Sequence, residues 1–495
     1  MILFPEIESS RTLDDYASFA HLAHAVQELR GEAALLEKRL RGRRVWMVNS
    51  TPRGGGVAEM MPMLVSMLRE LGIDTTWAVI STDRTEFFTL TKRLHNLIHG
   101  AGEPLFDGEA RELYQTVSRE NADELAPKID PNDILVIHDP QPLGCGALLK
   151  EKFGIPAIWR CHIGVEEHTP QTRSAWRFME PYATAYDHAV FTASEYIPDY
   201  LTGHTTLISP AIDPLSHKNR DLSPHKLMGV LCNSGLARTH QDVVTPPFDD
   251  RAQRLRSDGR FGPAAEAREV GFLYRPVVAQ VSRWDRLKGY APLLDGFVRL
   301  KREALAEGFA GDVRERRRLE LLQLVLAGPD PASIQDDPEA VEVLEEMCHH
   351  YAEIEPRVQR DIAIISLPMI SRKENALMVN AIQRCSLVVV QNSLREGFGL
   401  TATEAMWKHV PVLGTRAVGL RLQIREGVDG FLVRDPEQPG EISSALRRML
   451  EDPNDREMWG RSAQRRVYDQ YLIFRQVAGW IRTLSRVVER REEAA

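Results

Sequence analysis

The sequence lacks the features that mark secreted, zinc-binding and membrane-spanning proteins. Its 495 residues include only five cysteines, which are scattered and form no Cys-x-x-Cys pair, so neither a disulfide framework nor a zinc motif is expected. No apolar run reaches the length of about 20 residues that crosses a bilayer. The amino terminus carries acidic residues where a signal peptide would be basic. These absences predict a cytoplasmic protein.

An excess of charge of one sign is also missing. The chain has 62 basic and 70 acidic residues and a net charge of −8, with both signs spread along its length. This balance gives no reason to expect a nucleic acid or a membrane surface as partner. The short basic cluster at residues 314–318 is typical of a solvated helix face.

The length exceeds what one hydrophobic core usually supports, so two domains are expected. Residues 1–43 are predicted to be a helical lead-in, because apolar side chains recur at helical spacing between residues 12 and 42. Short apolar runs then alternate with helical patterns over residues 44–213. This alternation predicts an α/β domain with a parallel sheet covered on both faces.

The alternation stops at residue 214, and residues 214–271 are predicted to be a partly helical bridge between the domains. It returns over residues 272–460, which are predicted to form a second α/β domain. Residues 461–495 are predicted to be a helical segment that crosses back toward the first domain.

Three loops of the first half carry residues suited to a ligand site. Gly54, Gly55 and Gly56 follow the first apolar run and would allow a ligand to approach the backbone closely. They match neither a Walker motif nor GxGxxG, and a tight βα turn is the alternative. Asp139 and His162 follow two later strands. A lone histidine there is more often structural, but parallel strands would bring all three loops to one sheet edge.

Two basic residues lie just past the first strand of the second half. Arg283 and Lys288 are five residues apart on one loop. A guanidinium fork and an ammonium point charge suit a diphosphate. The alternative is ordinary surface charge.

The stretch REGFGLTATEAM, residues 395–406, has two glutamates around a Gly-Phe-Gly turn. Glu396 is predicted to lie in the loop and Glu404 on the first turn of the next helix. Glycines beside a helix amino terminus suit a phosphorylated sugar. The alternative is a capping box formed by Thr401 and Glu404.

These motifs resemble, in order and spacing, those of retaining GT-B glycosyltransferases of the Glu-x7-Glu class. The resemblance covers nearly the whole chain after residue 44. It implies an α/β GT-B fold with two Rossmann-like domains that face each other across a cleft.

Five stretches narrow the resemblance to trehalose glycosyltransferring synthases and retaining trehalose phosphorylases. They are VNSTPRGGGVAEMM (48–61), IHDPQP (137–142), WRCHIG (159–164), SPAIDPLSHKN (209–219) and REGFGLTATEAMWK (395–408).

The resemblance implies that the nucleotide-sugar donor lies on the second domain. Arg283 and Lys288 would neutralise the leaving diphosphate, so no cofactor and no metal are expected. Glu396 would bind the glucose hydroxyls and Glu404 the ribose. The turn against the sugar and phosphate would consist of Gly397, Phe398, Gly399 and Leu400.

The first domain would supply the acceptor side. His162 would reach the donor sugar, while the loop Gly54 to Gly56 and Asp139 would approach the acceptor or a phosphate. Retention of configuration without an evident nucleophile suggests front-face attack. Glu396, His162, Arg283 and Lys288 are therefore the predicted catalytic residues, with Glu396 as a positioning and electrostatic group.

The expected reaction is reversible transfer of glucose from ADP-glucose or UDP-glucose to glucose, giving trehalose. A trehalose phosphorylase using inorganic phosphate is an alternative, and so is a catalytically silent GT-B protein that binds nucleotide sugars. A transferase for lipid-linked or polymer acceptors would need a basic or apolar membrane face, and none stands out. The nucleotide base and the oligomeric state stay open, with a homodimer as one candidate.

Overall fold

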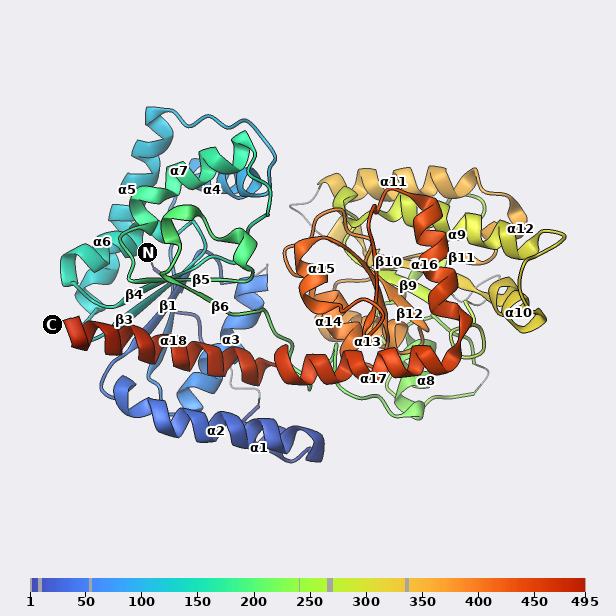
Figure 1. Cartoon of the computed structure of the whole chain (residues 1–495), viewed down its shortest axis with the longest axis horizontal. Helices are drawn as coiled ribbons and strands as arrows, with labels where there is room; N and C mark the ends of the chain where they lie inside the picture. Colours follow the sequence, from blue (N-terminus) through green and yellow to red (C-terminus); the bar gives the residue numbers. More distant parts are fainter. Residues whose placement is uncertain are drawn as a thin grey trace. The chain divides into compact units, whose positions relative to one another are not determined.

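The structure is a computed structural model that describes residues 2–7, 11–52, 56–239, 241–264, 270–333 and 338–494. Its internal contacts divide the chain into two units. The first unit comprises Met1–Ala211 and Ile473–Ala495, and the second comprises Ile212–Leu472. Both are α/β (Figure 1). No helix in the described ranges is long and apolar enough to cross a membrane.

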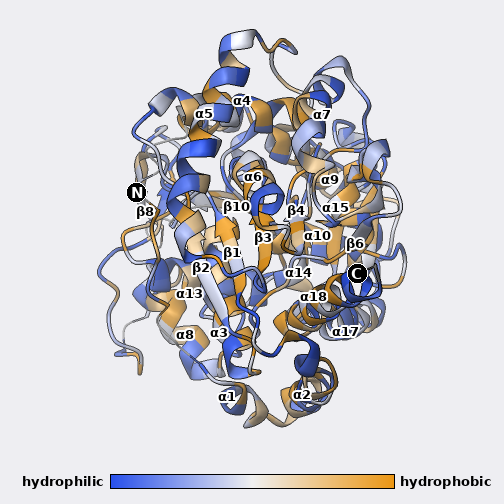
Figure 2. Ribbon diagram, turned by 90° about the vertical axis from the view of Figure 1, so that its left-hand side faces the viewer, coloured by the Kyte–Doolittle hydropathy of each residue, from blue (hydrophilic) through white to orange (hydrophobic). Residues whose placement is uncertain are grey.

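The sheet of the first unit is parallel throughout, with the order β2-β1-β3-β4-β5-β6. Central strands such as β1 and β3 are buried along their whole length and are hydrophobic in Figure 2. This pattern is expected where helices cover both faces. The strands are β1 (Val45–Asn49), β2 (Thr75–Val79), β3 (Ile134–His138), β4 (Ala157–Arg160), β5 (His188–Phe191) and β6 (Thr205–Leu207).

Helices cover both faces of this sheet (Figures 1 and 2). One layer consists of α4 (Thr85–Ile98), α5 (Gly108–Leu125), α6 (Leu143–Phe153) and α7 (Pro170–Ala183). The other consists of α1 (Leu13–Ala17), α2 (Ala20–Leu40), α3 (Gly56–Glu70) and α18 (Ile473–Ala494). Short 3-10 turns join these elements at Ala126–Lys128 (η1), Ser194–Tyr196 (η2) and Asp199–Leu201 (η3).

The amino-terminal helices and the carboxyl-terminal helix pack together. The helical stretch predicted at residues 12–42 is two helices, α1 and α2, with a break at Ser18 and Phe19. Arg39 pairs with Glu489 at 2.6 Å and Arg475 pairs with Glu28 at 2.9 Å, which joins α2 to α18. Both ends of the chain therefore belong to the first unit.

The sheet of the second unit has the order β14-β13-β12-β9-β10-β11-β7-β8. The strands from β14 to β11 are parallel, whereas β7 and β8 pair antiparallel at the edge beside β11. The strands are β7 (Gln253–Leu255), β8 (Phe261–Pro263), β9 (Val277–Val281), β10 (Gln323–Pro329), β11 (Ile362–Leu367), β12 (Val388–Val390), β13 (Val412–Thr415) and β14 (Gly430–Val433).

Alternate residues of these strands enter two separate cores. Val278 of β9 joins a cluster with α9, α10, α11 and α16, while Val277 and Ala279 join a cluster with α8 and α13. This division follows from the period of two along a strand.

The helices of the second unit are α8 (Pro224–Asn233), α9 (Tyr290–Leu305), α10 (Val313–Leu321), α11 (Pro338–Ala352), α12 (Pro356–Gln359), α13 (Arg372–Arg384), α14 (Leu400–Trp407), α15 (Val418–Gln423), α16 (Pro439–Glu451) and α17 (Pro453–Gln470), with the 3-10 turns η4 (Arg286–Lys288) and η5 (Pro331–Ser333).

The structure assigns the residues of two predicted segments to its two units. Residues 214–271, predicted as a bridge, supply α8, β7 and β8 to the second unit. Within residues 461–495, the end of α17 lies in the second unit and α18 in the first.

Candidate active site

Lys288 and Glu396 meet at the carboxyl edge of the second sheet. Lys288 ends the turn η4 after β9, and Glu396 lies in the loop between β12 and α14. Lys288 Nζ is 2.6 Å from Glu396 Oε2, and the two side chains are 14% and 13% exposed. Two residues 108 positions apart in the sequence thus form one partly buried ion pair.

Polar side chains hold the Glu396 carboxylate from its own loop. Ser393 Oγ donates to Glu396 Oε2 at 3.0 Å, and Gln391 Nε2 approaches the same oxygen at 3.4 Å. Gln391 Nε2 also donates to Ser393 Oγ at 2.9 Å. The carboxylate is therefore fixed in direction before any ligand is bound.

A buried amide pair joins the Lys288 loop to the Glu396 loop. Gln280 of β9 donates through Nε2 to the carbonyl of Lys288 at 2.8 Å, and its Oε1 accepts from the backbone of Asn392 at 2.9 Å. Asn392 Nδ2 donates to the carbonyl of Gly289 at 3.0 Å. Sequence reasoning missed both residues, although a glutamine inside the apolar run VVAQV was an available signal.

Gly289 allows this close approach. Its φ of +59° lies in the left-handed region, and an added Cβ would overlap the carbonyl oxygen of Asn392. Any other residue here would push the Lys288 loop away from the Glu396 loop.

The Gly-Phe-Gly turn is tied to the short helix α15. Gln423 Nε2 donates to the carbonyls of Phe398 and of Gly419, the latter at 3.0 Å. The N–H of Gly419 donates to the carbonyl of Glu396 at 3.0 Å. A Cβ on Gly419 would lie 2.5 Å from the nitrogen of Phe398. Gln423 is a further residue that the sequence reasoning missed.

The capping-box alternative for Thr401 and Glu404 is wrong. Gly399, with a φ of +85°, is the N-cap of α14, and no side chain caps this end. Leu400 is the first helical residue and is 37% exposed. Glu404 is therefore the fifth residue of the helix, one turn later than predicted, and lies beyond the reach of a capping group.

Glu404 lies in a buried cluster of charged and polar groups. Its side chain is 8% exposed, and Oε1 is 3.5 Å from Nζ of Lys218. Lys408 Nζ donates to the carbonyl of Glu404 at 2.9 Å and to Asn219 Oδ1 at 3.2 Å. Burial lowers the pKa of Lys408 to about 7, against the opposing effect of Glu404. The cluster fixes Glu404 from two sides.

The remaining cations of the loop after β9 point in different directions. Arg283 has a side chain that is 61% exposed, with Nη2 3.5 Å from Asp285 Oδ2. Arg286 instead pairs with Glu346 at 2.6 Å and with Glu342 at 3.2 Å, both on α11. Arg286 thus has a structural partner, whereas Lys288 faces Glu396.

In the first unit, the structure brings Asp139 and His162 together. The backbone N–H of His162 donates to Asp139 Oδ1 at 2.8 Å. Asp139 has a φ of +67°, a strained conformation for a residue with a side chain. Burial raises the pKa of Asp139 to about 6, opposed by the hydrogen bond from His162 and by Arg160. Burial also lowers the pKa of His162 well below its ordinary value.

The glycine loop is only partly described. Gly56 begins α3, and a Cβ there would meet nothing within 4 Å. Gly54 and Gly55 lie outside the described residues.

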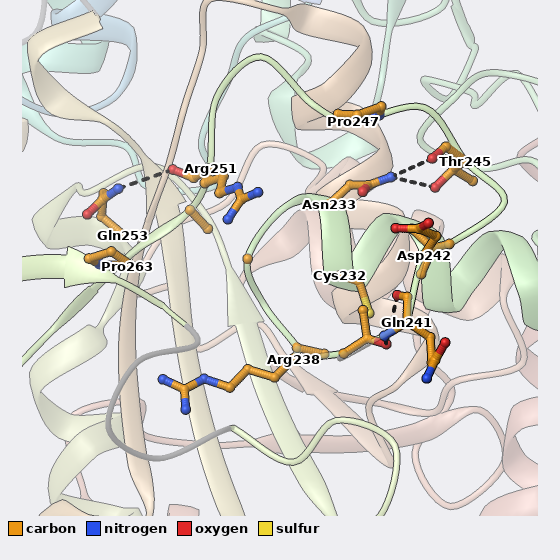
Figure 3. A pocket seen from close by; sticks show the side chains of 15 residues that line it. Cys232, Asn233, Arg238, Gln241, Asp242, Thr245, Pro247, Arg251, Gln253 and Pro263 are labelled. Carbon is orange, nitrogen blue, oxygen red and sulfur yellow. Dashed lines mark hydrogen bonds between the residues drawn. The ribbon is translucent and has the colours of Figure 1, made fainter.

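A separate cavity of about 660 Å³ lies beside the end of α8 in the second unit (Figure 3). Exposed polar side chains line it, among them Arg238, Gln241, Asp242 and Arg251. None of the predicted site residues borders this cavity.

Comparisons with known proteins match both halves of the chain. Residues 47–198 match the family described as trehalose synthase, N-terminal domain, and residues 266–466 match glycosyl transferases group 1. A trehalose synthase from Rubrobacter xylanophilus is 34% identical over 484 residues, which cover 97% of each protein.

Two more distant proteins extend the comparison. A trehalose phosphorylase from Pleurotus sajor-caju is 27% identical over 426 residues, which cover 82% of this chain and 52% of that protein. A solved UDP-forming α,α-trehalose-phosphate synthase from Burkholderia xenovorans has a TM-score of 0.61 at 17% identity and covers 90% of this chain and 99% of its own. The similarity confirms the predicted GT-B class, with two Rossmann-like α/β units.

Proposed function

Because the chain belongs to the trehalose synthase family of glycosyltransferases, we propose that it transfers glucose reversibly from a nucleoside diphosphate glucose to free glucose, making trehalose. The observation that carries the proposal is the Lys288–Glu396 ion pair, with its 2.6 Å contact at the carboxyl edge of the second sheet. In open α/β sheets this edge is where ligands bind.

The cations would act on the leaving group. As the bond from glucose C1 to the phosphate oxygen breaks, negative charge develops on the diphosphate. Lys288, held in place by Glu396 and by the Gln280 bond to its carbonyl, would offer a fixed ammonium to that charge, and Arg283 a second cation. Fixed charges stabilise a transition state without reorganisation. Metal independence is part of this proposal.

The carboxylates would position the donor. Glu396 accepts hydrogen bonds, so it suits hydroxyls of the glucose ring, and Glu404 suits those of the ribose. The acceptor hydroxyl would form the new bond to C1 on the face that the diphosphate leaves. Its proton would pass to the departing phosphate oxygen, so that trehalose and a nucleoside diphosphate are the products.

A panel of sugars tests the reaction. The EDTA-treated enzyme is mixed with ADP-glucose, UDP-glucose or GDP-glucose and with glucose or glucose 6-phosphate, and the products are separated. We expect trehalose from at least one nucleotide sugar with glucose and without added metal. Absence of trehalose from every glucose reaction, or a product only with glucose 6-phosphate, would reject the proposed acceptor.

Trehalose phosphorylase is a second candidate, favoured by the 27% identity to the Pleurotus enzyme. It is distinguished by trehalose breakdown. The proposed synthase consumes trehalose with a nucleoside diphosphate, whereas a phosphorylase consumes it with inorganic phosphate. A protein that binds nucleotide sugars in the panel and turns over none would be catalytically silent.

A further inference from the structure

His162 is hydrogen-bonded to a second histidine that the proposed mechanism does not use. Nε2 of His162 lies 2.9 Å from Nδ1 of His138, the last residue of β3. The two rings are nearly parallel, with an interplanar angle of 17°. His138 is completely buried, and the ring of Trp480 on α18 lies 5.8 Å from it. The imidazole pair is therefore screened from water on the His138 side.

The neutral form of both rings is favoured in this environment. Burial and, to a smaller extent, the Arg160 guanidinium lower the pKa of His138 to about 3. The same two causes act on His162, together with His138 itself. A neutral pair shares one proton in its N···N hydrogen bond, so either His138 or His162 is the donor.

Met47 decides between the two arrangements. The other nitrogen of His138, Nε2, lies 3.4 Å from Sδ of Met47 on β1. A thioether sulfur can accept a hydrogen bond but has no proton to donate. The stable arrangement therefore places a proton on His138 Nε2, facing the sulfur, and leaves His138 Nδ1 as an acceptor. The proton in the N···N bond then belongs to His162 Nε2.

We propose that His138, backed by Met47, is a positioning residue that holds His162 as the Nε2–H tautomer and leaves His162 Nδ1 unprotonated. Nδ1 has no hydrogen-bond partner among the described residues, and the side chain is partly exposed. An unprotonated nitrogen accepts from a hydroxyl and repels a phosphate oxygen. His162 would thus bind a sugar hydroxyl in preference to a phosphate oxygen. This part of the inference rests on the function proposed above.

Nitrogen NMR tests the tautomer in the free enzyme. Protein labelled with ¹⁵N-histidine is compared with a His162→Asn variant, which identifies the His162 signals. We expect the Nε2 signal of His162 at the shift of a protonated nitrogen and its Nδ1 signal at that of an unprotonated one. The reverse pattern, or a doubly protonated ring at neutral pH, overturns the proposal.

Two methionine variants test the role of Met47. Met47→Leu removes the sulfur, so His162 should shift to a mixture of tautomers. Met63→Leu is the matched control, because Met63 also accepts through sulfur, from Tyr16 at 3.6 Å, in the same unit. An unchanged His162 spectrum in Met47→Leu overturns the proposal.

Turnover gives a second readout. His138→Phe removes the acceptor for His162 Nε2–H, and trehalose synthesis should fall roughly 10- to 100-fold, as when other orienting partners are lost. Circular dichroism checks that the variant folds. Full turnover in a folded His138→Phe enzyme contradicts the proposal. If the wild-type enzyme makes no trehalose, the proposed function fails, while the NMR result still decides the tautomer.

Discussion

Lys288 and Glu396 combine a short contact with partial burial. At such a site each charge depends on the other, because removing one partner leaves a charge with less solvent to stabilise it. Ser393 and Gln391 would still hydrogen-bond Glu396 if Lys288 were lost. A change at Lys288 should therefore affect chemistry more than folding.

Lys288→Ala should lower kcat by about 10² to 10³, the range for losing one fixed group that stabilises transition-state charge. Steady-state kinetics of trehalose synthesis gives the measurement. Arg286→Ala is the matched control, since Arg286 lies on the same turn but pairs with Glu342 and Glu346. Equal losses in both variants would show that the effect comes from the loop and not from the Lys288 charge.

The lowered pKa of Lys408 predicts that the stability of the protein depends on pH. Its pKa is lowered to about 7 in the folded protein, whereas an unfolded lysine titrates at about 10.4. Between these values the unfolded chain binds the extra proton, so stability rises with pH. Lys408→Met removes this effect, and its stability advantage over the wild type should shrink by up to about 1.4 kcal/mol per pH unit.

Urea unfolding between pH 7 and pH 10 measures this difference. The control is Lys226→Met, which replaces an exposed lysine on α8. Stability curves of Lys408→Met and wild type that run parallel over this range would contradict the assignment.

Residues of the candidate site differ in how far the sequence alone predicts their roles. The sequence alone indicates Glu396 and Lys288 as candidates, because each follows an apolar run, and the structure has strands β12 and β9 at these runs. Asn392 and Gln423 donate to carbonyls of loops that are remote in the sequence. Gln280 accepts from the backbone of Asn392, which is 112 positions away. No local pattern specifies such partners, so their roles required the folded structure.

At the scale of elements, the site depends on how α15 packs against the Gly-Phe-Gly turn. Gly419 removes the side chain that would otherwise separate them, and its N–H reaches the carbonyl of Glu396. Close backbone packing of this kind positions the turn without any charged group.

Gly419→Ala should displace the turn, because its Cβ would lie 2.7 Å from the carbonyl carbon of Gly397. We expect a lower thermal midpoint and weaker donor binding, measured by calorimetry. Gly31→Ala is the contrasting variant. It lies inside α2 with nothing within 4 Å of the added carbon, so it should stabilise by about 0.5–1 kcal/mol. A Gly419→Ala enzyme as stable and as tight-binding as wild type would refute this packing argument.

Elements with clear periodicity were predictable and short ones were not. Short apolar runs in the sequence predicted the buried parallel strands, and the structure has strands at these runs. β7 and β8 have only three residues each, with the sequences QRL and FGP, and such segments carry no readable alternation. The start of α14 was predicted too late, because threonine is a common N-cap residue and Thr401 was read as one. In the structure the N-cap is Gly399, in the left-handed conformation, and the helix begins at the next residue.

At the scale of the whole molecule, the two units differ in how the chain builds them. The second is one continuous segment, Ile212–Leu472, whereas the first needs both ends of the chain. A continuous unit with its own sheet and cores meets the usual conditions for independent folding.

Residues 212–472 expressed alone should unfold in one cooperative transition, because the described residues of two large core clusters all lie within this segment. Differential scanning calorimetry measures it. If these cores require contacts with the first unit, the fragment will show no cooperative unfolding transition.

A chain ending at Leu472 should lose a stable first unit. The missing helix α18 buries Val477, Trp480, Ile481 and Leu484, and their partners would be exposed to water. Thermal unfolding and aggregation assays check this result, with a chain lacking only residues 493–495 as control. Full solubility and unchanged unfolding of the shorter chain would contradict it.

The placement of α18 also bears on synthesis of the protein. A ribosome releases the chain from its amino end, so the strands of the first unit emerge early and their covering helix emerges last. The second unit is complete before that helix leaves the ribosome. During translation the first unit therefore remains incomplete, with one face of its sheet only partly covered. It is the part of the chain that would most need protection by chaperones.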